Sequence, residues 1–337
     1  MAITADQVYK QFRHGSRVRL NLINNYLILR KLRARLKREA PKPKLIGVFL
    51  LEHLGDIVAC EPIVRYLKKK NPNAYIIWGV KKAYREITEN NPNIDRTLLI
   101  HCLSERLMLT NYGLFDEVID LHFSDRCCAL CRKPLKKDYS LSKIDLKNYF
   151  QYGGLLAAMA QSAGLPALDD QPAVYIPESA VKKVDSLNLP KEFIVINCTS
   201  NAPEKGWLAD KWIRLLADIK DKIGMPVFEI GTETFLDPSL MLSRSLCGKL
   251  SILVSAEVIR RAKLFIGIDT GPAHLANAVG TFGVIMLGSY LGFESYNPFN
   301  GAYRDGSNAV LLYSKGLVTD IKVDSVFEEV ERYLDKS

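Results

Sequence analysis

Short apolar runs alternate with amphipathic stretches along most of the chain, and this alternation predicts an α/β protein. The first series opens with an apolar run at 45–51, and a helical spacing of apolar positions follows over about 57–70. Further strands are expected at 75–80, 97–100 and 117–121, and further helices over about 82–90 and 145–163. Because strands that are separated by helices pair in parallel, we expect a sheet with helices on both of its faces.

A second series of the same kind begins near Pro190. Its strands are expected at 193–197, 227–230, 264–268 and 283–287, and its helices over about 209–223, 238–247, 256–262, 271–279 and 323–334. We therefore predict an amino-terminal leader at 1–43, one domain at 44–185 and a second domain at 186–337. Two Rossmann-like parallel-sheet domains of this kind are expected to face a cleft, in which ligands bind at the carboxyl ends of the strands.

The leader carries the excess positive charge of the chain. Residues 1–44 hold twelve Lys or Arg residues against Asp6 and Glu39, whereas the rest of the chain holds 34 basic and 35 acidic residues. Its apolar positions gather along one side of a helix, where Leu22, Tyr26, Leu29 and Leu36 lie beside Ile23, Leu27 and Leu32. A basic amphipathic helix suits the anionic surface of a membrane, which we favour as its partner. Packing on the protein's own body is the alternative, and nucleic acid is not expected to bind.

The composition is that of a globular protein. Hydrophobic residues make up 48% of the 337 residues, which is enough to bury a large core in two domains. No stretch has the roughly 18 to 20 apolar residues that cross a bilayer, and the amino terminus lacks the pattern of a secretory signal. Seven cysteines, an odd number, fit reduced thiols better than disulfides. We therefore expect a cytoplasmic protein that is peripheral on the inner face of the cytoplasmic membrane.

The run FIGIDTGPAHLANAVG, from Phe265 to Gly280, predicts a buried strand that turns directly into a helix. Gly271 permits the tight turn, and Pro272 suits the first helical position. The backbone N–H groups from Thr270 to Ala273 are expected to point outward, and with the helix dipole they favour a bound anion such as a nucleotide diphosphate. The alternative is an ordinary strand-to-helix turn, in which glycine and proline serve geometry alone.

Other polar residues lie just beyond predicted strand ends. Asp56 precedes a helix, where it is either a helix cap or a general base that takes a proton from an attacking hydroxyl. Thr199, Ser200 and Lys205 lie in one polar loop and are candidates to bind phosphate oxygens. His274 is either a hydrogen-bonded structural residue or a contact of the same anion.

Signatures of other cofactors are absent from the sequence. It has neither G-x-G-x-x-G nor a P-loop motif, so we expect neither a dinucleotide dehydrogenase nor a P-loop enzyme. It also has no Asp-x-Asp pair to hold a divalent metal on a diphosphate. Cys128 and Cys131, beside Cys127, have the spacing of a zinc site, but Cys102 or His122 would complete such a site only through folding. We therefore predict no metal and no cofactor.

Three segments together resemble glycosyltransferase family 9, the ADP-heptose:lipopolysaccharide heptosyltransferases. They are LGDIVACEPIVRYLKKKNPNAYIIWGV at 54–80, EKGW at 204–207 and IDTGPAHLANAVGTFGVIMLG at 268–288. The resemblance implies a GT-B fold, with the nucleotide in the carboxyl-terminal domain and the acceptor in the amino-terminal one. It also implies inverting, metal-independent transfer of heptose or a related sugar from a nucleotide-sugar donor, most simply ADP-heptose. The acceptor implied is a lipopolysaccharide or another glycolipid or glycan.

The resemblance also implies roles for individual residues. Asp56 matches the catalytic aspartate, and Lys205 matches a phosphate-binding lysine. Glu233 looks like an acidic residue that holds the nucleoside part of the donor, and a helix-start carboxylate is the alternative. Asp269, Thr270, Gly271 and His274 match the donor-binding motif. The other predicted donor or phosphate contacts, which rest on the local pattern, are Thr199, Ser200, Pro272 and Ala273. Two other functions stay open, namely a sugar-nucleotide epimerase on the same fold and an inactive transferase fold that serves as a membrane-associated binding or scaffold protein.

Overall fold

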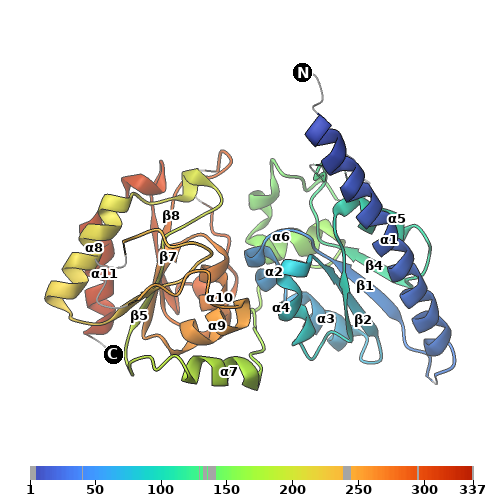
Figure 1. The fold of residues 1–337 in the computed structure, drawn as a ribbon, viewed down its shortest axis with the longest axis horizontal. Coiled ribbons are helices and arrows are strands. Elements are labelled where there is room, and N and C mark those ends of the chain that lie inside the picture. Colours follow the sequence, from blue (N-terminus) through green and yellow to red (C-terminus); the bar gives the residue numbers. More distant parts are fainter. Residues whose placement is uncertain are drawn as a thin grey trace. The chain divides into compact units, whose positions relative to one another are not determined.

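The chain folds into two compact units, each built on its own parallel sheet (Figure 1). The computed structural model describes residues 5–39, 41–128, 130–131, 135, 142–237, 244–293 and 296–335, with side chains from Tyr9 onward. The first unit comprises Met1–His53, Glu61–Tyr152 and Ala157–Leu168, and the second comprises Leu54–Cys60, Gly153–Leu156 and Asp169–Ser337. The boundary predicted between residues 185 and 186 therefore lies inside the second unit, and the leader is part of the first unit.

The first unit contains a four-stranded sheet of order β3-β2-β1-β4 in which all pairs are parallel. Its strands are β1 (Leu45–Phe49), β2 (Tyr75–Val80), β3 (Arg96–Leu99) and β4 (Glu117–Asp120). Its helices are α1 (Ala5–Leu36), α3 (Pro62–Lys70), α4 (Arg85–Glu89), α5 (Leu103–Thr110) and most of α6 (Leu155–Ser162), with short 3-10 turns η1 (Lys82–Tyr84) and η2 (Tyr149–Tyr152). In Figure 1, α1 and α5 lie on one side of this sheet, and α3 and α4 lie on the other.

Helix α1 packs one face on the body of the first unit. Leu29, Leu32 and Leu36 are buried in the same hydrophobic core as Phe49 and other residues of the sheet. The amide of Asn25 donates hydrogen bonds to the carbonyl of Leu99 at 2.9 Å and to Glu105 at 3.2 Å, so this face of the helix is fixed by polar contacts as well. This face of α1 therefore packs on the protein's own body, which was the alternative to membrane binding predicted for the leader.

The second unit contains a five-stranded parallel sheet of order β6-β5-β7-β8-β9. Its strands are β5 (Ile194–Asn197), β6 (Val227–Glu229), β7 (Leu264–Ile268), β8 (Gly283–Leu287) and β9 (Ala309–Tyr313). Its helices are α2 (Leu54–Ala59), α7 (Glu178–Asp185), α8 (Ala209–Lys222), α9 (Ile252–Arg261), α10 (Gly271–Val279) and α11 (Val323–Leu334), with 3-10 turns η3 (Pro203–Lys205), η5 (Gly301–Tyr303) and η6 (Val318–Asp320).

Helices cover both faces of the second sheet. Trp212 on α8 and Val326 on α11 are buried against β5, β7 and β8, and α7, α9 and α10 lie on the opposite side (Figure 1). Every residue of β7 and β8 is buried, as expected for strands that are covered on both faces. The prediction of two parallel-sheet α/β units with an amino-terminal helix is confirmed.

Several predicted elements differ from the observed ones. The helix predicted over 57–70 is broken into α2 and α3, because Pro62 has no N–H to continue the helical bonds and suits a helix start instead. The helix predicted over 145–163 is reduced to η2 and α6. Of the helix predicted over 238–247, residues 238–243 lie outside the described residues, and 244–247 are not helical. Helices α5 and α7 and strand β9 were not predicted.

Candidate active site

Helices α2 and α10 pack closely within the second unit and bring Asp56 next to the predicted donor motif. A Cβ atom at Gly55 would lie 2.6 Å from Cδ2 of His274, and one at Gly271 would lie 2.9 Å from Cδ2 of Leu54. Only glycine fits at these two positions without displacing a neighbour. Asp56 directly follows Gly55, the residue that lies against the His274 ring, and it is half-buried in the first turn of α2.

The junction of β7 and α10 has the predicted geometry, with one correction. β7 ends at Ile268, Thr270 is the extended residue before α10, and Pro272 lies in the first turn. The prediction of outward N–H groups from Thr270 to Ala273 is wrong at two of these positions. The N–H of Ala273 donates to the carbonyl of Thr270 at 3.1 Å, and proline has no N–H. The amides of Thr270 and Gly271 are the two left to meet an anion.

Lys205 and Asp269 form a largely buried ion pair at the carboxyl ends of the strands. The Lys205 ammonium lies 2.5 Å from Oδ2 of Asp269, and their side chains are only 16% and 8% exposed. The Tyr296 hydroxyl donates to the same oxygen at 2.7 Å, and Nε2 of His274 lies 3.6 Å from Oδ1. Burial alone would raise the pKa of Asp269, but the positive charge of Lys205 and the contact with His274 hold this pKa well below its usual range. Asp269 is therefore ionised and positions Lys205.

Two tyrosines that sequence reasoning missed surround the Lys205 ammonium. This nitrogen lies 3.9 Å from the ring centroid of Tyr290 and 5.6 Å from that of Tyr296, which is the geometry of cation–π contacts. Both tyrosines follow β8, so their position beyond a strand end is the signal that was available in the sequence. With Asp269 they keep the cation within a partly buried, polar site.

Asn197 joins the carboxyl ends of three neighbouring strands. Its amide oxygen accepts a hydrogen bond from the Thr270 hydroxyl at 2.6 Å, and its amide nitrogen donates to the carbonyl of Ile230 at 2.9 Å. The loop that follows it carries Thr199 and Ser200, both half-buried, and the Ser200 hydroxyl accepts from the N–H of Ala202 at 3.1 Å. The structure thus places this loop at the same sheet edge as Thr270.

The acidic residue predicted to hold a nucleoside, Glu233, is exposed in the loop after β6. The buried carboxyl group in this region belongs instead to Glu229, which accepts a hydrogen bond from the N–H of Phe235 at 3.0 Å. Burial raises the pKa of Glu229. Glu229 therefore stabilises the loop that carries Glu233, and the nucleoside contact of Glu233 stays a prediction.

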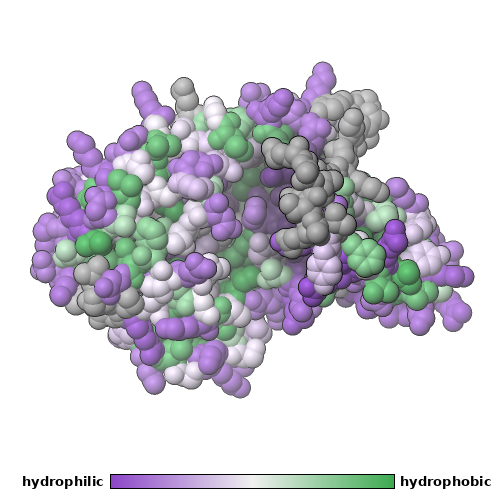
Figure 2. Space-filling model, turned by 45° about the horizontal axis from the view of Figure 1, so that its top comes forward, coloured by the Kyte–Doolittle hydropathy of each residue, from purple (hydrophilic) through white to green (hydrophobic). Residues whose placement is uncertain are grey.

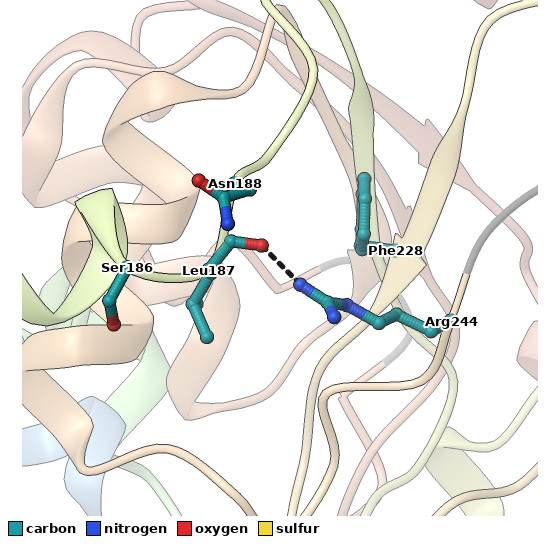
Figure 3. Close-up of a pocket in the computed structure, with 5 residues that line it drawn as sticks. All are labelled: Ser186, Leu187, Asn188, Phe228 and Arg244. Carbon is teal, nitrogen blue, oxygen red and sulfur yellow. Dashed lines mark hydrogen bonds between the residues drawn. The ribbon is translucent and has the colours of Figure 1, made fainter.

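The second unit also has a surface hollow of about 390 Å³ (Figure 3). Its lining residues are Ser186, Leu187, Asn188, Phe228 and Arg244. The guanidinium of Arg244 donates to the carbonyl of Leu187, so the cation of this hollow is already bonded. Since no predicted site residue lines the hollow, we place the candidate site around Lys205 and Asp269.

Comparison with known proteins agrees with the fold. Residues 154–288 match the sequence model of glycosyltransferase family 9 (heptosyltransferase). The lipopolysaccharide core heptosyltransferase OpsX of Haemophilus influenzae is 20% identical over 86% of this chain and 97% of its own length.

Solved structures of similar proteins cover nearly the whole chain. A glycosyltransferase family 9 structure from Veillonella parvula has a TM-score of 0.68 at 21% identity and covers 87% of this chain and 98% of its own. The ADP-heptose LPS heptosyltransferase II of E. coli has a TM-score of 0.62 at 16% identity and covers 87% of this chain and 99% of its own. These likenesses concern the fold, and they confirm the predicted GT-B class.

Taken together, the two parallel-sheet units and the sequence matches define a glycosyltransferase. The segments that carry the resemblance at 204–207 and 268–288 lie within the matched part of the chain and supply Lys205, Asp269 and α10. These matches support the predicted resemblance to glycosyltransferase family 9.

Proposed function

We propose that this glycosyltransferase moves heptose, or a related sugar, from ADP-heptose to a lipopolysaccharide or another glycolipid or glycan acceptor. The observation that carries the proposal is the Lys205–Asp269 ion pair at the start of α10, with Asp56 on the helix that packs against α10. The names of the relatives support the choice of substrates, since OpsX acts on the lipopolysaccharide core and the E. coli enzyme is named for ADP-heptose and LPS.

In the proposed reaction, Asp56 acts on the attacking acceptor hydroxyl and Lys205 acts on the leaving diphosphate. A carboxylate oxygen of Asp56 accepts the proton of the acceptor hydroxyl, and the hydroxyl oxygen attacks the anomeric carbon of the donor. The bond from that carbon to the diphosphate oxygen breaks, and its electron pair leaves with the nucleoside diphosphate. Lys205 and the amides of Thr270 and Gly271 stabilise the departing charge, so the transfer step needs no metal. Attack opposite the leaving group inverts the anomeric configuration.

The donor prediction is tested by thermal unfolding with ADP, UDP, GDP and their sugars. A ligand at one hundred times its dissociation constant adds about 2.7 kcal/mol to the free energy of unfolding, so ADP and ADP-heptose are expected to raise Tm clearly. Release of ADP that depends on an added acceptor would support transfer. Consumption of the donor without an acceptor would indicate an epimerase, and absence of any nucleotide binding would indicate a scaffold protein.

We also propose that α1 binds the anionic, cytoplasmic face of a membrane. Opposite its buried face it exposes a second apolar stripe, made of Tyr9, Phe12, Leu20, Ile23 and Leu27. At about 100° per residue, these side chains span an arc of about 80°. Arg13, Arg19 and Lys31, all exposed, lie along its borders, and such a pattern suits an interfacial helix on anionic lipid.

Figure 2 shows exposed hydrophobic side chains among hydrophilic ones at the right, where the first unit lies. Among the described residues, no helix combines the length and the hydropathy that a bilayer span requires.

A Phe12→Ser, Leu20→Ser double variant is expected to bind phosphatidylglycerol vesicles at least about tenfold more weakly. Each Phe or Leu side chain that becomes buried in the lipid contributes about 1.5–3 kcal/mol to binding. Both side chains are more than 70% exposed, so the substitutions leave the core intact. Sedimentation with vesicles measures the effect, and Leu208→Ser, Leu317→Ser is the matched control on the second unit. Equal binding by the parent chain and the Phe12, Leu20 variant would reject a membrane contact of α1.

A further inference from the structure

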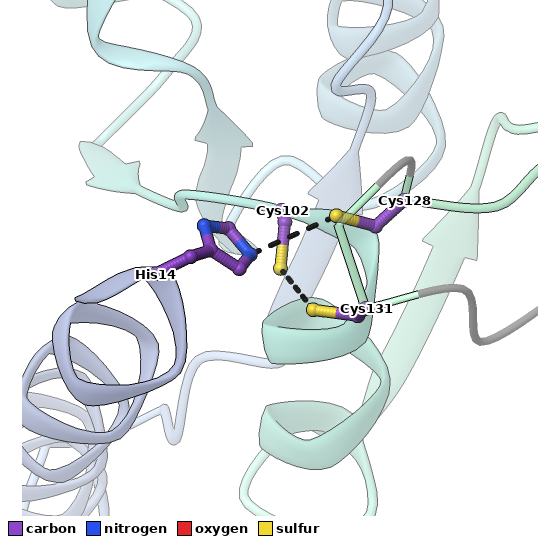
Figure 4. A group of neighbouring side chains, drawn as sticks. All are labelled: His14, Cys102, Cys128 and Cys131. Carbon is purple, nitrogen blue, oxygen red and sulfur yellow. Dashed lines mark hydrogen bonds between the residues drawn. The ribbon is translucent and has the colours of Figure 1, made fainter. Parts of the chain in front are cut away.

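The first unit contains a cluster of thiols and one imidazole that plays no part in the proposed transfer. His14 on α1, Cys102 at the start of α5, and Cys128 and Cys131 on the loop after β4 point toward one another (Figure 4). Their four ligand atoms, one nitrogen and three sulfurs, all lie within 4.8 Å of one another. Since Cys128 and Cys131 form a Cys-x-x-Cys pair, the folded chain supplies the second pair of ligands that the sequence pattern lacks.

Two of the distances in this cluster have the values expected around a tetrahedral metal ion. With metal–sulfur bonds of about 2.3 Å and a metal–nitrogen bond of about 2.0 Å, tetrahedral zinc separates two sulfurs by about 3.8 Å and a sulfur from a nitrogen by about 3.5 Å. Sγ of Cys102 lies 3.8 Å from Sγ of Cys131, and Sγ of Cys128 lies 3.7 Å from Nε2 of His14. The sulfur–sulfur separation is too long for a disulfide, and both separations are close to the edges of the coordination tetrahedron.

We propose that His14, Cys102, Cys128 and Cys131 bind one structural Zn²⁺ ion. Three soft sulfurs and one imidazole nitrogen in a closed tetrahedral set select zinc among the common divalent ions. Binding releases the three thiol protons. This proposal departs from the prediction of no metal, which took neither His14 nor its distance from Cys128 into account.

The ion would fasten the amino-terminal half of α1 to the body of the first unit. Between Tyr9 and Leu20, Val18 is the one described side chain that is buried, so this part of α1 has little apolar packing of its own. The ligands come from α1, from the residue before α5 and from the loop after β4. A single ion therefore joins three separate segments, and its site is distinct from the candidate active site, whose residues all lie in the second unit.

The proposal is tested on the full chain, purified with a reductant and without a chelator. Elemental analysis is expected to find about one zinc per chain, and replacement of zinc by Co²⁺ is expected to give the strong visible absorption of tetrahedral cobalt thiolate. Cys102→Ser and Cys131→Ser are expected to lose the metal, while Cys127→Ser, which alters an exposed cysteine outside the cluster, keeps it. Removal of zinc is expected to speed tryptic cleavage at Arg13, Arg17 and Arg19.

Several outcomes would overturn the proposal. A parent chain that contains no zinc and takes up neither Zn²⁺ nor Co²⁺ would reject the site, even if the serine variants fail to fold. Iron in place of zinc would reject the choice of metal, and equal metal loss in Cys127→Ser and Cys131→Ser would reject the ligand set. Unchanged tryptic cleavage after zinc removal would reject the fastening of α1.

Discussion

An Asp56→Asn variant is expected to lose about 10²–10⁴-fold in kcat, while it binds the nucleotide-sugar donor as tightly as the parent chain. Asparagine has the size of aspartate but is not a base at neutral pH, so it removes proton acceptance and little else. Asp56 is half-buried in the first turn of α2, beside the close contact of Gly55 with His274. Initial rates of ADP release with saturating donor and acceptor measure kcat, and thermal shift with ADP-heptose measures donor binding.

The matched control is Asp210→Asn, which makes the same change in the first turn of α8 at an exposed position. This variant is expected to keep the activity of the parent chain. Undiminished turnover in Asp56→Asn would eliminate Asp56 as the base. Loss of donor affinity together with turnover would instead assign Asp56 to donor binding, and equal loss in the Asp210 variant would show that the effect is not specific to the site.

Local sequence signals predicted the elements that support the site. Strand β2, strand β7 and helix α11 have the bounds that apolar periodicity indicated. The junction at Gly271 and Pro272 was predictable because glycine and proline restrict the backbone through their own chemistry, without help from distant residues. The sequence placed Asp56 just before a helix that starts at about Ile57, whereas α2 starts at Leu54 and holds Asp56 in its first turn.

Elements that depend on their surroundings were not predictable in the same way. Strand β9 is the edge strand of its sheet and is only partly buried, so its burial pattern depends on pairing with β8. Helix α1 has two apolar faces, one buried in the core and one exposed. The periodicity of its sequence contains both faces, and only the fold shows which of them the body of the first unit covers.

The partners of the chemical groups are also set by the fold. Lys205 and Asp269 are 64 positions apart, and His14 and Cys128 are 114 positions apart. No spacing rule connects residues at such separations, so the sequence offered Lys205 only as a phosphate ligand and left the cysteines without a fourth ligand. The structure adds the counter-charge of Asp269 to Lys205, and with it a measurable contribution to stability.

At neutral pH, Asp269→Asn is expected to lower the free energy of unfolding of the second unit by about 3–5 kcal/mol, because it leaves the Lys205 ammonium in a mostly buried site without its partner. Urea unfolding followed by tryptophan fluorescence measures this loss. In a Trp78→Phe background the two remaining tryptophans, Trp207 and Trp212, report on the second unit.

The effect is expected to depend on pH with a defined sign. The pKa of Asp269 is lower in the folded chain than in the unfolded chain, where a value of about 3.9 applies. The ion pair therefore contributes its full stability above the unfolded pKa, and this contribution is lost as the pH falls from about 4 toward the folded pKa. The difference in stability between the parent chain and Asp269→Asn should be constant from pH 8 to about pH 5 and should shrink below about pH 4.

The control for burial is Asp324→Asn, which removes an ion pair of similar length on the surface. Arg214 and Asp324 lie 2.6 Å apart, but both side chains are more than 60% exposed, so this change is expected to cost less than about 1 kcal/mol. If Asp269→Asn costs no more than Asp324→Asn, the buried pair does not stabilise the unit.

A Lys205→Met, Asp269→Asn double variant is expected to lose less stability than the two single changes added together, since it leaves no unpaired charge. Because it also lacks the cation proposed to stabilise the leaving diphosphate, this double variant should regain stability without regaining transfer, which separates the structural role of the pair from the chemical role of Lys205.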